Sequence, residues 1–331
     1  MKLLYGSHLP NFPQGSVATI GNFDGVHLGH QALLKRLKAK ACQLNKPLVV
    51  ILFEPQPLEY FAKSTHPIRL SSLRDKLLML QKCAVDYVYC LKFNQQMANL
   101  SPEAFMQTYL YQRLHVRFLL IGRDFRFGFK RRGDVEMLRA FGHTHHMEVA
   151  VLNDHLHQQT RISSTDIRHL LKQNKLNQAK ALLGRAYDLQ RKVIRGKGLA
   201  RTWGFPTANC KMGREFSPLA GVYCVRVTLC DGRLYSGVAN IGCRPTVQGQ
   251  YTLLEVHLFN FNETLYHQSI SVAFLHKLRD EIKFASIDLL IAQIKQDILQ
   301  AQALFDVPDR KLDINNNPPQ TLIKISIWKR F

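Results

Sequence analysis

The chain has 331 residues, 46% of them hydrophobic and 21% charged, and carries a formal net charge of +21 at pH 7. This composition is typical of a folded globular protein and excludes collagen-like, disordered and membrane-spanning chains, while the length predicts two domains. The basic residues are spread along the chain with only short clusters such as Lys130-Arg131-Arg132, which favours small anionic substrates over a specific nucleic-acid interface.

The cysteines and the first residues predict a cytoplasmic protein. Seven cysteines occur without a CxxC pair, which argues against a disulfide framework or a structural zinc site. We expect most of them, Cys224 and Cys230 included, to be small buried hydrophobic residues. The apolar start at Met1 is interrupted by Gly6 and Pro10 before a signal core of about 7–15 residues can form, so nothing directs export.

Short apolar runs alternate with helical stretches over residues 17–190. We expect strands at 17–20, 48–53, 87–91 and 118–121, and helices at 30–40, 71–82, 102–114 and 166–173. This alternation predicts an α/β domain with a parallel sheet wrapped by helices. Ligands of such sheets lie at the carboxyl ends of the strands, so the loops after Ile20, Phe53 and Ile121 are candidate binding loops.

Beyond residue 191 the pattern changes to short alternating strands, which predict an antiparallel β-barrel. The strands are expected at 222–229, 234–241 and 253–259, with Asp231-Gly232 as a hairpin turn. A helix over 286–304 follows, with apolar positions at Leu289, Leu290, Ile294, Ile298 and Leu299. The rest is expected to be a linker and an extra strand over 321–328.

The first concentration of chemistry is the segment from Ile20 to His30, between a strand and a helix. Gly21, Gly25 and Gly29 let the backbone approach phosphates, and the helix start offers free N–H groups and a positive dipole end. His27 and His30 can donate hydrogen bonds to a triphosphate whose charge grows during attack. The alternative is that both histidines only cap the helix or pack against it.

The HxGH pattern of these histidines resembles the HxGH nucleotidyltransferases, which transfer a nucleoside monophosphate from ATP to an acceptor phosphate. The resemblance implies a Rossmann-like domain in which the loop residues around the motif bind ATP, Phe23 and Asp24 among them. Such transfer needs positioning and charge stabilisation rather than a covalent intermediate, which suits histidine donors, a helix terminus and Mg²⁺.

Two further segments resemble bacterial FAD synthetases. The segment from Ile121 to Gly128 carries their GxDFRFG pattern, which implies a flavin and nucleotide pocket formed by Asp124, Phe125 and Phe127. A second phosphate motif, Arg161 with Ser163, Ser164 and Thr165, precedes a helix, where hydroxyls and free amides can hold pyrophosphate and Arg161 can counter its charge. Taken alone, the three hydroxyl residues are better explained as an N-terminal helix cap than as a phosphate site.

A second concentration of motifs resembles riboflavin kinases. Gly196, Lys197 and Gly198 precede a GFPTAN signature at 204–209, and the resemblance implies that this glycine segment folds over the phosphates of ATP. Thr207 and Asn209 supply oxygen ligands that suit Mg²⁺ bound with ATP. Without the resemblance, this stretch is a turn with capping residues.

Further matches to riboflavin kinases lie at 221–223, 237–247 and 255–257. The resemblance implies Glu255 as the base that accepts the proton of the riboflavin 5′-hydroxyl, although a carboxylate on an alternating strand can simply face solvent. The resemblance also implies that Arg279 contacts flavin or phosphate. The alternative is that Arg279 only forms a salt bridge at the surface. The chain departs from the family at Arg195, Ala200, Asn260 and His267, where the family has histidine, glycine, aspartate and glycine.

The resemblance as a whole is to bacterial bifunctional riboflavin kinase/FMN adenylyltransferases. It implies an adenylyltransferase domain at 1–186, a kinase domain at 187–305 and a tail of unassigned role at 306–331. The substrates and products would be riboflavin, ATP, ADP, FMN, FAD and pyrophosphate, with Mg²⁺ as cofactor. Two alternatives stay open: an adenylyltransferase whose barrel only binds flavin or regulates, and a nucleic-acid-associated protein that uses the basic charge. The oligomeric state is not predicted.

Overall fold

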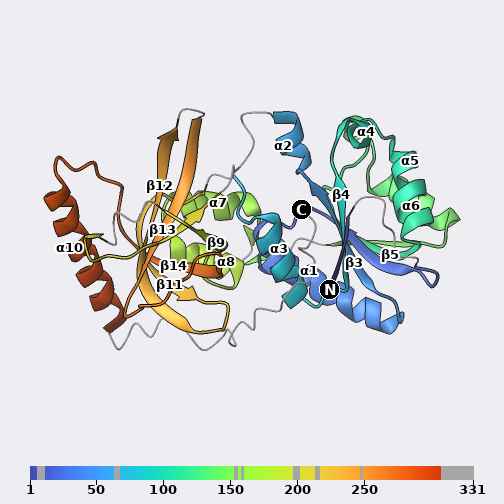
Figure 1. The fold of residues 1–331 in the computed structure, drawn as a ribbon. Helices are drawn as coiled ribbons and strands as arrows, with labels where there is room; N and C mark the ends of the chain where they lie inside the picture. The colour runs from blue at the N-terminus through green and yellow to red at the C-terminus, as the bar shows by residue number, and fades with distance from the viewer. Residues whose placement is uncertain are drawn as a thin grey trace. The chain divides into compact units, whose positions relative to one another are not determined.

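The computed structural model describes residues 1–5, 12–62, 68–152, 156–157, 160–196, 202–212, 217–246 and 249–306. The chain forms two compact units. The first contains Met1–Pro67 and Leu73–Ser164, and the second contains Ile68–Ser72 and Thr165–Phe331. Figure 1 traces both units in chain order.

The first unit is an α/β unit built around six strands. Its strands are β1 (Lys2–Tyr5), β2 (Ser16–Ile20), β3 (Leu48–Glu54), β4 (Tyr87–Lys92), β5 (Val116–Gly122) and β6 (Glu148–Leu152), with a small ladder of β7 (Leu156–His157) and β8 (Thr160–Arg161). Its helical segments are η1 (Asp24–Val26), α1 (Leu28–Gln43), α2 (Pro57–Ala62), α3 (Leu73–Lys82), α4 (Gln95–Ala98), α5 (Pro102–Phe105), η2 (Met106–Arg113), η3 (Phe129–Arg131) and α6 (Val135–Thr144).

The six strands form one sheet in the order β1-β4-β3-β2-β5-β6. Every neighbouring pair is parallel, so the predicted parallel sheet is confirmed. The four predicted strands are β2, β3, β4 and β5, and the sequence prediction missed the two edge strands β1 and β6. The helix predicted at 102–114 is present as α5 followed by the π-helical η2.

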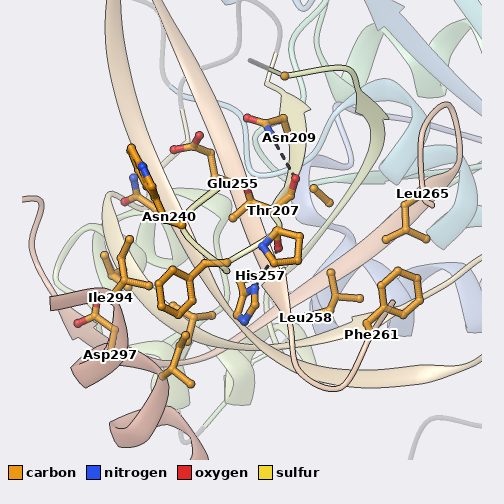
Figure 2. Close-up of a pocket in the computed structure, with 18 of the residues that line it drawn as sticks. Thr207, Asn209, Asn240, Glu255, His257, Leu258, Phe261, Leu265, Ile294 and Asp297 are labelled. Carbon is orange, nitrogen blue, oxygen red and sulfur yellow. Dashed lines mark hydrogen bonds between the residues drawn. The ribbon is translucent and has the colours of Figure 1, made fainter. Parts of the chain in front are cut away.

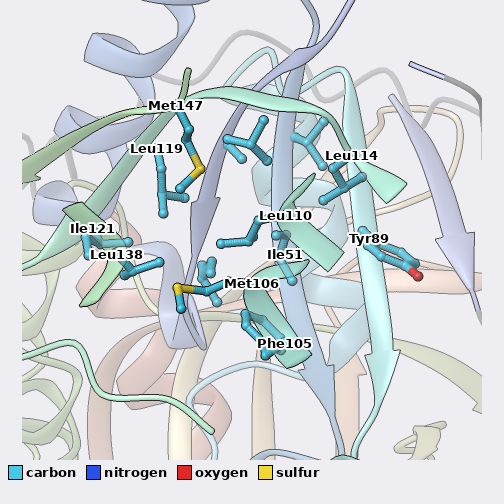
Figure 3. Packing of buried hydrophobic residues seen from close by; sticks show 14 of the residues in the cluster. Ile51, Tyr89, Phe105, Met106, Leu110, Leu114, Leu119, Ile121, Leu138 and Met147 are labelled. Atoms are coloured by element: carbon cyan, nitrogen blue, oxygen red, sulfur yellow. The ribbon is translucent and has the colours of Figure 1, made fainter. Parts of the chain in front are cut away.

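Alternating side chains of the strands fill two separate cores, because successive residues of a strand point to opposite faces. On one face, Ile51 and Leu119 pack with Phe105, Met106 and Leu110 of the α5–η2 segment (Figure 3). On the other face, strand residues pack against α1 and α3. The sheet is therefore covered by helices on both faces, which holds the carboxyl ends of its strands in fixed positions.

The second unit is a closed barrel with helices. Its elements are α7 (Ser164–Lys172), which begins at the last residue of the first unit, α8 (Leu176–Leu183), β9 (Asp188–Ile194), β10 (Ala208–Lys211), β11 (Gly221–Thr228), β12 (Leu234–Thr246), β13 (Gly249–Leu258), β14 (Ser269–Arg279) and α10 (Ile287–Asp306). The barrel order is β10-β13-β12-β11-β14-β9, and the pairing is antiparallel throughout. The predicted antiparallel barrel is confirmed.

The predicted hairpin at Asp231-Gly232 joins β11 to β12. Gly232 has a φ of 90°, a conformation that glycine adopts without steric cost. The backbone N–H of Leu229 donates to the carbonyl of Arg233 at 2.9 Å, and Asp231 accepts from the backbone N–H of Arg233 at 3.0 Å. The turn residues thus set the register of the hairpin, as the sequence indicated.

Two details of the sequence prediction are wrong. Cys224 is buried as expected, but Cys230 is exposed and its thiol donates to Gln268 Oε1 at 3.2 Å. The helix predicted at 286–304 is present as α10, but Leu289 and Leu299 are 55% and 67% exposed, so its apolar pattern is wider than the face it buries.

The strand predicted at 321–328 lies outside the described residues. Among the described helices, none is long and apolar enough to cross a membrane.

Candidate active sites

The loops after β2 and β5 lie at the point where the order of strands along the chain reverses. From β2 the chain winds through β3 on one side, and it later places β5 on the other side of β2. Open parallel sheets bind ligands at the carboxyl ends of their strands at such a switch point. Two of the three loops expected from the sequence, those after Ile20 and Ile121, therefore flank one position. Phe53, which precedes the third, lies in β3 on the far side of β2 from β5.

The loop after β2 has an unusual backbone. Phe23, Gly25 and Val26 have φ values of 49°, 76° and 41°, all in the left-handed region. For a β-branched residue such as Val26 this is a strained conformation, which the surrounding structure must stabilise. Phe23, Asp24 and Val26 are buried, so their packing holds the loop in this shape.

His27 and His30 lie side by side at the start of α1. Their rings stack with centroids 3.7 Å apart, and Phe23 packs against His30 with centroids 4.8 Å apart. His27 caps the helix, because its Nδ1 accepts a hydrogen bond from the backbone N–H of His30 at 3.4 Å. A ring nitrogen that accepts carries no hydrogen, so Nε2 is the donor of His27. A Cβ at Gly29 would lie 3.2 Å from the His27 ring, so glycine gives the ring its space.

His30 is held in its neutral form. Burial lowers its pKa well below 6.5, and the nearby His27 and Lys76 lower it further. Lys76 is a buried residue of α3, a feature that the sequence prediction missed. The Nδ1 atom of His30 is buried and has no hydrogen-bond partner among the described residues. A neutral imidazole with an unused nitrogen can still bind a ligand by one hydrogen bond.

The second phosphate motif lies against the first. The hydroxyl of Ser164, the first residue of α7, donates to the carbonyl of Asp24 at 2.9 Å, although 140 residues separate them. A Cβ at Gly29 would lie 3.9 Å from Cβ of Ile162, which places the backbone before α7 beside the start of α1. Ser163 and Thr165 are the neighbours of Ser164 on either side, and Arg161 belongs to β8.

In the loop after β5, the predicted aromatic residues lie at different depths. Asp124 is exposed and Phe125 is partly buried, whereas Phe127 is only 7% exposed and belongs to the hydrophobic core. The rings of Phe125 and Phe127 stack with centroids 5.6 Å apart. The buried Phe127 therefore packs against Phe125 and restricts its position. Asp134 caps α6 by accepting from the backbone N–H of Met137 at 3.0 Å, which attaches the end of this loop.

The barrel unit contains a cavity of about 770 Å³, a size in the range of small-molecule sites. Figure 2 shows Asn209, Glu255 and Asn240 along its wall. Glu255 of β13 is paired directly with Asn209 of β10 on one side and with Asn240 of β12 on the other. Directly opposed residues of antiparallel strands point to the same face, so one carboxylate lies between two amides on three adjacent strands. The cavity is also lined by Thr207 and His257.

Asn209 is packed directly over Gly196. Its Nδ2 donates to the carbonyl of Thr207 at 3.3 Å, which leaves Oδ1 as the acceptor end of the amide. A Cβ at Gly196 would lie 2.5 Å from Nδ2, so only glycine allows this contact. Lys197 and Gly198, also predicted to bind ATP, lie outside the described residues.

Arg279 contributes to the cavity wall while bound to the C-terminal helix. Its Nη2 and Nε lie 2.7 and 2.9 Å from the carboxylate of Asp297 in α10, and Nη1 donates to the carbonyl of Asp280 at 3.0 Å. Asp297 is only 3% exposed and also accepts from Gln293 at 2.9 Å. Arg279 belongs to the second unit, whereas the Asp124 loop belongs to the first, and the Arg279 guanidinium also lies over the Phe284 ring. The sequence prediction missed Asp297, because a carboxylate on an amphipathic helix normally faces solvent.

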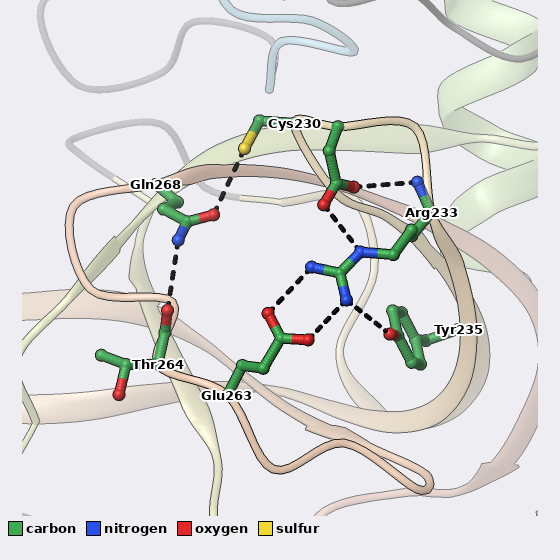
Figure 4. A network of polar contacts seen from close by, with 7 residues as sticks. Cys230, Arg233, Tyr235, Glu263, Thr264 and Gln268 are labelled. Atoms are coloured by element: carbon green, nitrogen blue, oxygen red, sulfur yellow. Dashed lines mark hydrogen bonds and ion pairs between the residues drawn. The ribbon is translucent and has the colours of Figure 1, made fainter.

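The loop between β13 and β14 supplies another part of the cavity wall, including Phe261 and Glu263. Arg233 of the β11–β12 hairpin binds this loop (Figure 4): Nη2 of Arg233 donates to Glu263 Oε2 at 2.8 Å, and Nε of Arg233 donates to Asp231 at 2.7 Å. The guanidinium of Arg233 lowers the pKa of Glu263, and the backbone N–H of Arg233 together with its guanidinium lowers the pKa of Asp231. The ring of Tyr235 meets Phe261 edge-on with centroids 5.0 Å apart. These contacts attach the loop to the β11–β12 hairpin.

The donor set in the cavity fits a magnesium ion that is shared with phosphate oxygens. The hydroxyl of Thr207 and the amide oxygen of Asn209 are hard oxygen ligands on the cavity wall. Among the described residues, no cluster of three or more histidine, cysteine, aspartate or glutamate side chains could hold a metal ion. Mg²⁺ commonly uses one or two protein oxygens together with substrate phosphates, so this set of ligands suits it.

Comparison with known proteins gives two family matches and close relatives. The family model described as FAD synthetase matches residues 9–166, and the one described as riboflavin kinase matches residues 183–305. A bifunctional riboflavin kinase/FMN adenylyltransferase from Haemophilus influenzae is 47% identical over 92% of this chain and 100% of its own length. The protein of that name from Escherichia coli K12 is 45% identical over 92% and 98%.

A solved structure shares the fold. The crystal structure of a Streptococcus pneumoniae protein that is named a macrolide-efflux protein superposes with a TM-score of 0.75 at 29% sequence identity. The superposition covers 89% of this chain and 97% of that one.

Proposed function

Because the chain belongs to the family of bifunctional riboflavin kinase/FMN adenylyltransferases, it converts riboflavin to FMN and FMN to FAD, and we propose that it uses two separate sites, one in each unit. The barrel cavity is proposed as the kinase site. The switch point of the parallel sheet is proposed as the adenylyltransferase site.

In the kinase site, Glu255 accepts the proton of the riboflavin 5′-hydroxyl. The 5′-oxygen of riboflavin bonds to the γ-phosphorus of ATP while the bond between that phosphorus and the leaving ADP breaks. A carboxylate within hydrogen-bond reach of the hydroxyl suits this task. Thr207 and Asn209 hold Mg²⁺, which supplies charge neutralisation for the phosphates. Gly196 lets the backbone approach those phosphates, and Lys197 and Gly198 are proposed to bind ATP with it. Arg279 contacts flavin or phosphate with the N–H groups that Asp297 leaves unused.

In the adenylyltransferase site, a phosphate oxygen of FMN bonds to the α-phosphorus of ATP and pyrophosphate leaves. His27 donates from Nε2, and neutral His30 donates from one ring nitrogen, to oxygens that gain charge during the attack. Gly21, Gly25 and Gly29, with Phe23 and Asp24 in the loop, let the backbone approach ATP. Asp124 and Phe125 form the flavin side of the pocket, supported by Phe127.

The pyrophosphate is held where α7 begins. The N–H groups of the helix start and the hydroxyls of Ser163 and Thr165 would bind the leaving group, and Arg161 would counter its charge. Ser164 fixes this helix start to the histidine loop through its bond to Asp24. This bond is the single observation that carries the adenylyltransferase assignment, because it joins two phosphate motifs that the sequence keeps far apart.

A flavin assay tests the proposal directly. Pure protein with riboflavin and Mg-ATP should accumulate FMN and then FAD, with release of pyrophosphate in the second step only. Glu255→Gln should abolish FMN formation and leave FMN-to-FAD conversion intact. His30→Ala should slow FAD formation by about 10²–10³-fold, the usual effect of removing one charge-stabilising donor, and leave FMN formation intact. Loss of both activities in either variant would refute the two-site assignment.

We further propose that residues 1–186 form the adenylyltransferase domain, that 187–305 form the kinase domain, and that the protein works in the cytoplasm with small molecules as its only ligands. The two family matches, at residues 9–166 and 183–305, support one domain on each side of this boundary, while the division into compact units places α7 and α8 with the barrel. Separate expression of 1–186 and 187–305 tests them. Each piece should keep its own activity.

A further inference from the structure

We infer that His257 is a positioning residue of the kinase, which holds the turn at Pro206 and Thr207 against β13 and so fixes the distance between the proposed metal ligand Thr207 and Glu255. The inference rests on the proposed kinase site in the barrel cavity. It assigns to His257 a task in binding MgATP that is distinct from the proton transfer at Glu255.

The turn before β10 has little backbone pairing to hold it. The ladder between β10 and β13 ends at the pair Ala208 and Val256, so Pro206 and Thr207 lie beyond the last paired residue. His257 continues the attachment with its side chain, because its Nδ1 lies 2.9 Å from the carbonyl oxygen of Pro206. Proline has no N–H, so this carbonyl is the one backbone group through which residue 206 can be held by a hydrogen bond.

The bond fixes the hydrogen position on the ring. A carbonyl oxygen only accepts, so Nδ1 of His257 carries the hydrogen and donates it. Nδ1 keeps this hydrogen in both the neutral and the protonated ring, so the attachment does not depend on the charge of the imidazole. The ring is also held between two aromatic neighbours, since Phe205 and Phe259 meet it edge-on with centroids 6.1 and 5.9 Å away.

The position of His257 explains why this bond affects the reaction. His257 follows Glu255 by two residues on β13, and alternate residues of a strand share a face. Thr207 precedes Asn209 by two residues on the facing segment, and all four side chains line the cavity. The strand that carries the base therefore pairs with Asn209 through its backbone and also holds the turn that carries Thr207. A shift of about 1 Å in such a set can cost about 10²-fold in rate.

Three substitutions of His257 separate this role from others. His257→Phe keeps an aromatic ring between Phe205 and Phe259 and removes the hydrogen bond. His257→Asn places an amide nitrogen near the position of Nδ1 and can keep the bond, whereas His257→Gln places one near Nε2 and cannot. Initial rates of FMN formation give kcat and the KM for MgATP, and flavin fluorescence gives the affinity for riboflavin alone.

The Phe and Gln variants should raise the KM for MgATP about tenfold or more and lower kcat by up to about 10²-fold, and the Asn variant should recover most of both. Riboflavin binding and FMN-to-FAD conversion should stay at wild-type levels in all three. Recovery by Gln instead of Asn would overturn the inference, as would equal losses in all three variants or an unimpaired Phe variant. Wild-type protein that makes no FMN would refute the proposed kinase site itself.

Discussion

Substitution of Gly196 by alanine would test how tightly the proposed magnesium ligand is held. A Cβ at this position would lie 2.5 Å from Nδ2 and 2.7 Å from Cγ of Asn209, where ordinary contacts begin at 3.4 Å. The amide would therefore have to retreat by about 0.9 Å, the difference between 3.4 and 2.5 Å. Its bond to the carbonyl of Thr207, at 3.3 Å, would then be lost or redirected.

The expected result is a folded protein with a poor kinase. The clash is with the end of a flexible side chain, so the cost in stability should be about 0.5–1.5 kcal/mol, that of one off-rotamer side chain. Displacing a catalytic ligand by about 1 Å should lower FMN formation by about 10²-fold. Gly196 and Asn209 both belong to the barrel unit, so conversion of FMN to FAD should be unchanged.

The assay compares both reactions in one preparation of Gly196→Ala. Initial rates of FMN formation from riboflavin and Mg-ATP are measured beside rates of FAD formation from FMN, and urea unfolding gives the change in stability. A kinase rate within about threefold of wild type would refute the argument, because the predicted displacement corresponds to about 10²-fold. A loss of both activities together with several kcal/mol of stability would refute it as well.

Three further outcomes follow from the contacts. The pKa of His30 lies well below 6.5, so at a pH below 6.5 the unfolded chain binds a proton at His30 that the folded chain does not bind. As the pH falls below 6.5, urea titrations should therefore show the free energy of unfolding decreasing by at most about 1.4 kcal/mol per pH unit. His30→Gln should make this decrease smaller, and a larger decrease would contradict the argument. Asp297→Ala leaves Arg279, 17% exposed, without its carboxylate and should cost about 3 kcal/mol in urea unfolding, with Asp297→Asn costing less; equal costs would contradict the ion pair. Ser164→Ala removes the bond to Asp24 and should cost about 1 kcal/mol and slow FAD formation severalfold at unchanged FMN formation; an unchanged FAD rate would argue against a role in the site.

The sequence predicted the inner strands of the sheet because they are buried on both faces and appear as continuous apolar runs, as in β3. The edge strands β1 and β6 were missed because each has a mixture of exposed and partly buried residues. In the barrel, β9, β10 and β14 were missed for a related reason. Their pairing partners are far away in sequence, and local periodicity carries no information about closure.

The candidate sites show the same difference between local features, which the sequence predicts, and features that depend on residues far away in the chain. Motif spacing pointed to His27 and His30, because a glycine-rich turn before a helix is a local property, whereas Glu255 was implied only by the resemblance to riboflavin kinases. The neutral state of His30 depends on burial and on Lys76, which comes from a different helix. The burial of Asp297 depends on an arginine from β14, and no local pattern distinguishes it from a solvent-facing carboxylate. Sequence patterns therefore indicated which chemistry is present, while packing decides which groups are charged and which are held still.

The bond between Ser164 and Asp24 also has a consequence for the order in which the protein matures during translation. When only the first hundred or so residues have left the ribosome, His27 and His30 are already present, but Ser164, which holds their loop, has not yet been synthesised. Nascent chains stalled before residue 164 should therefore be unable to make FAD, and arrest slightly further along should permit it once the helix start has cleared the exit tunnel.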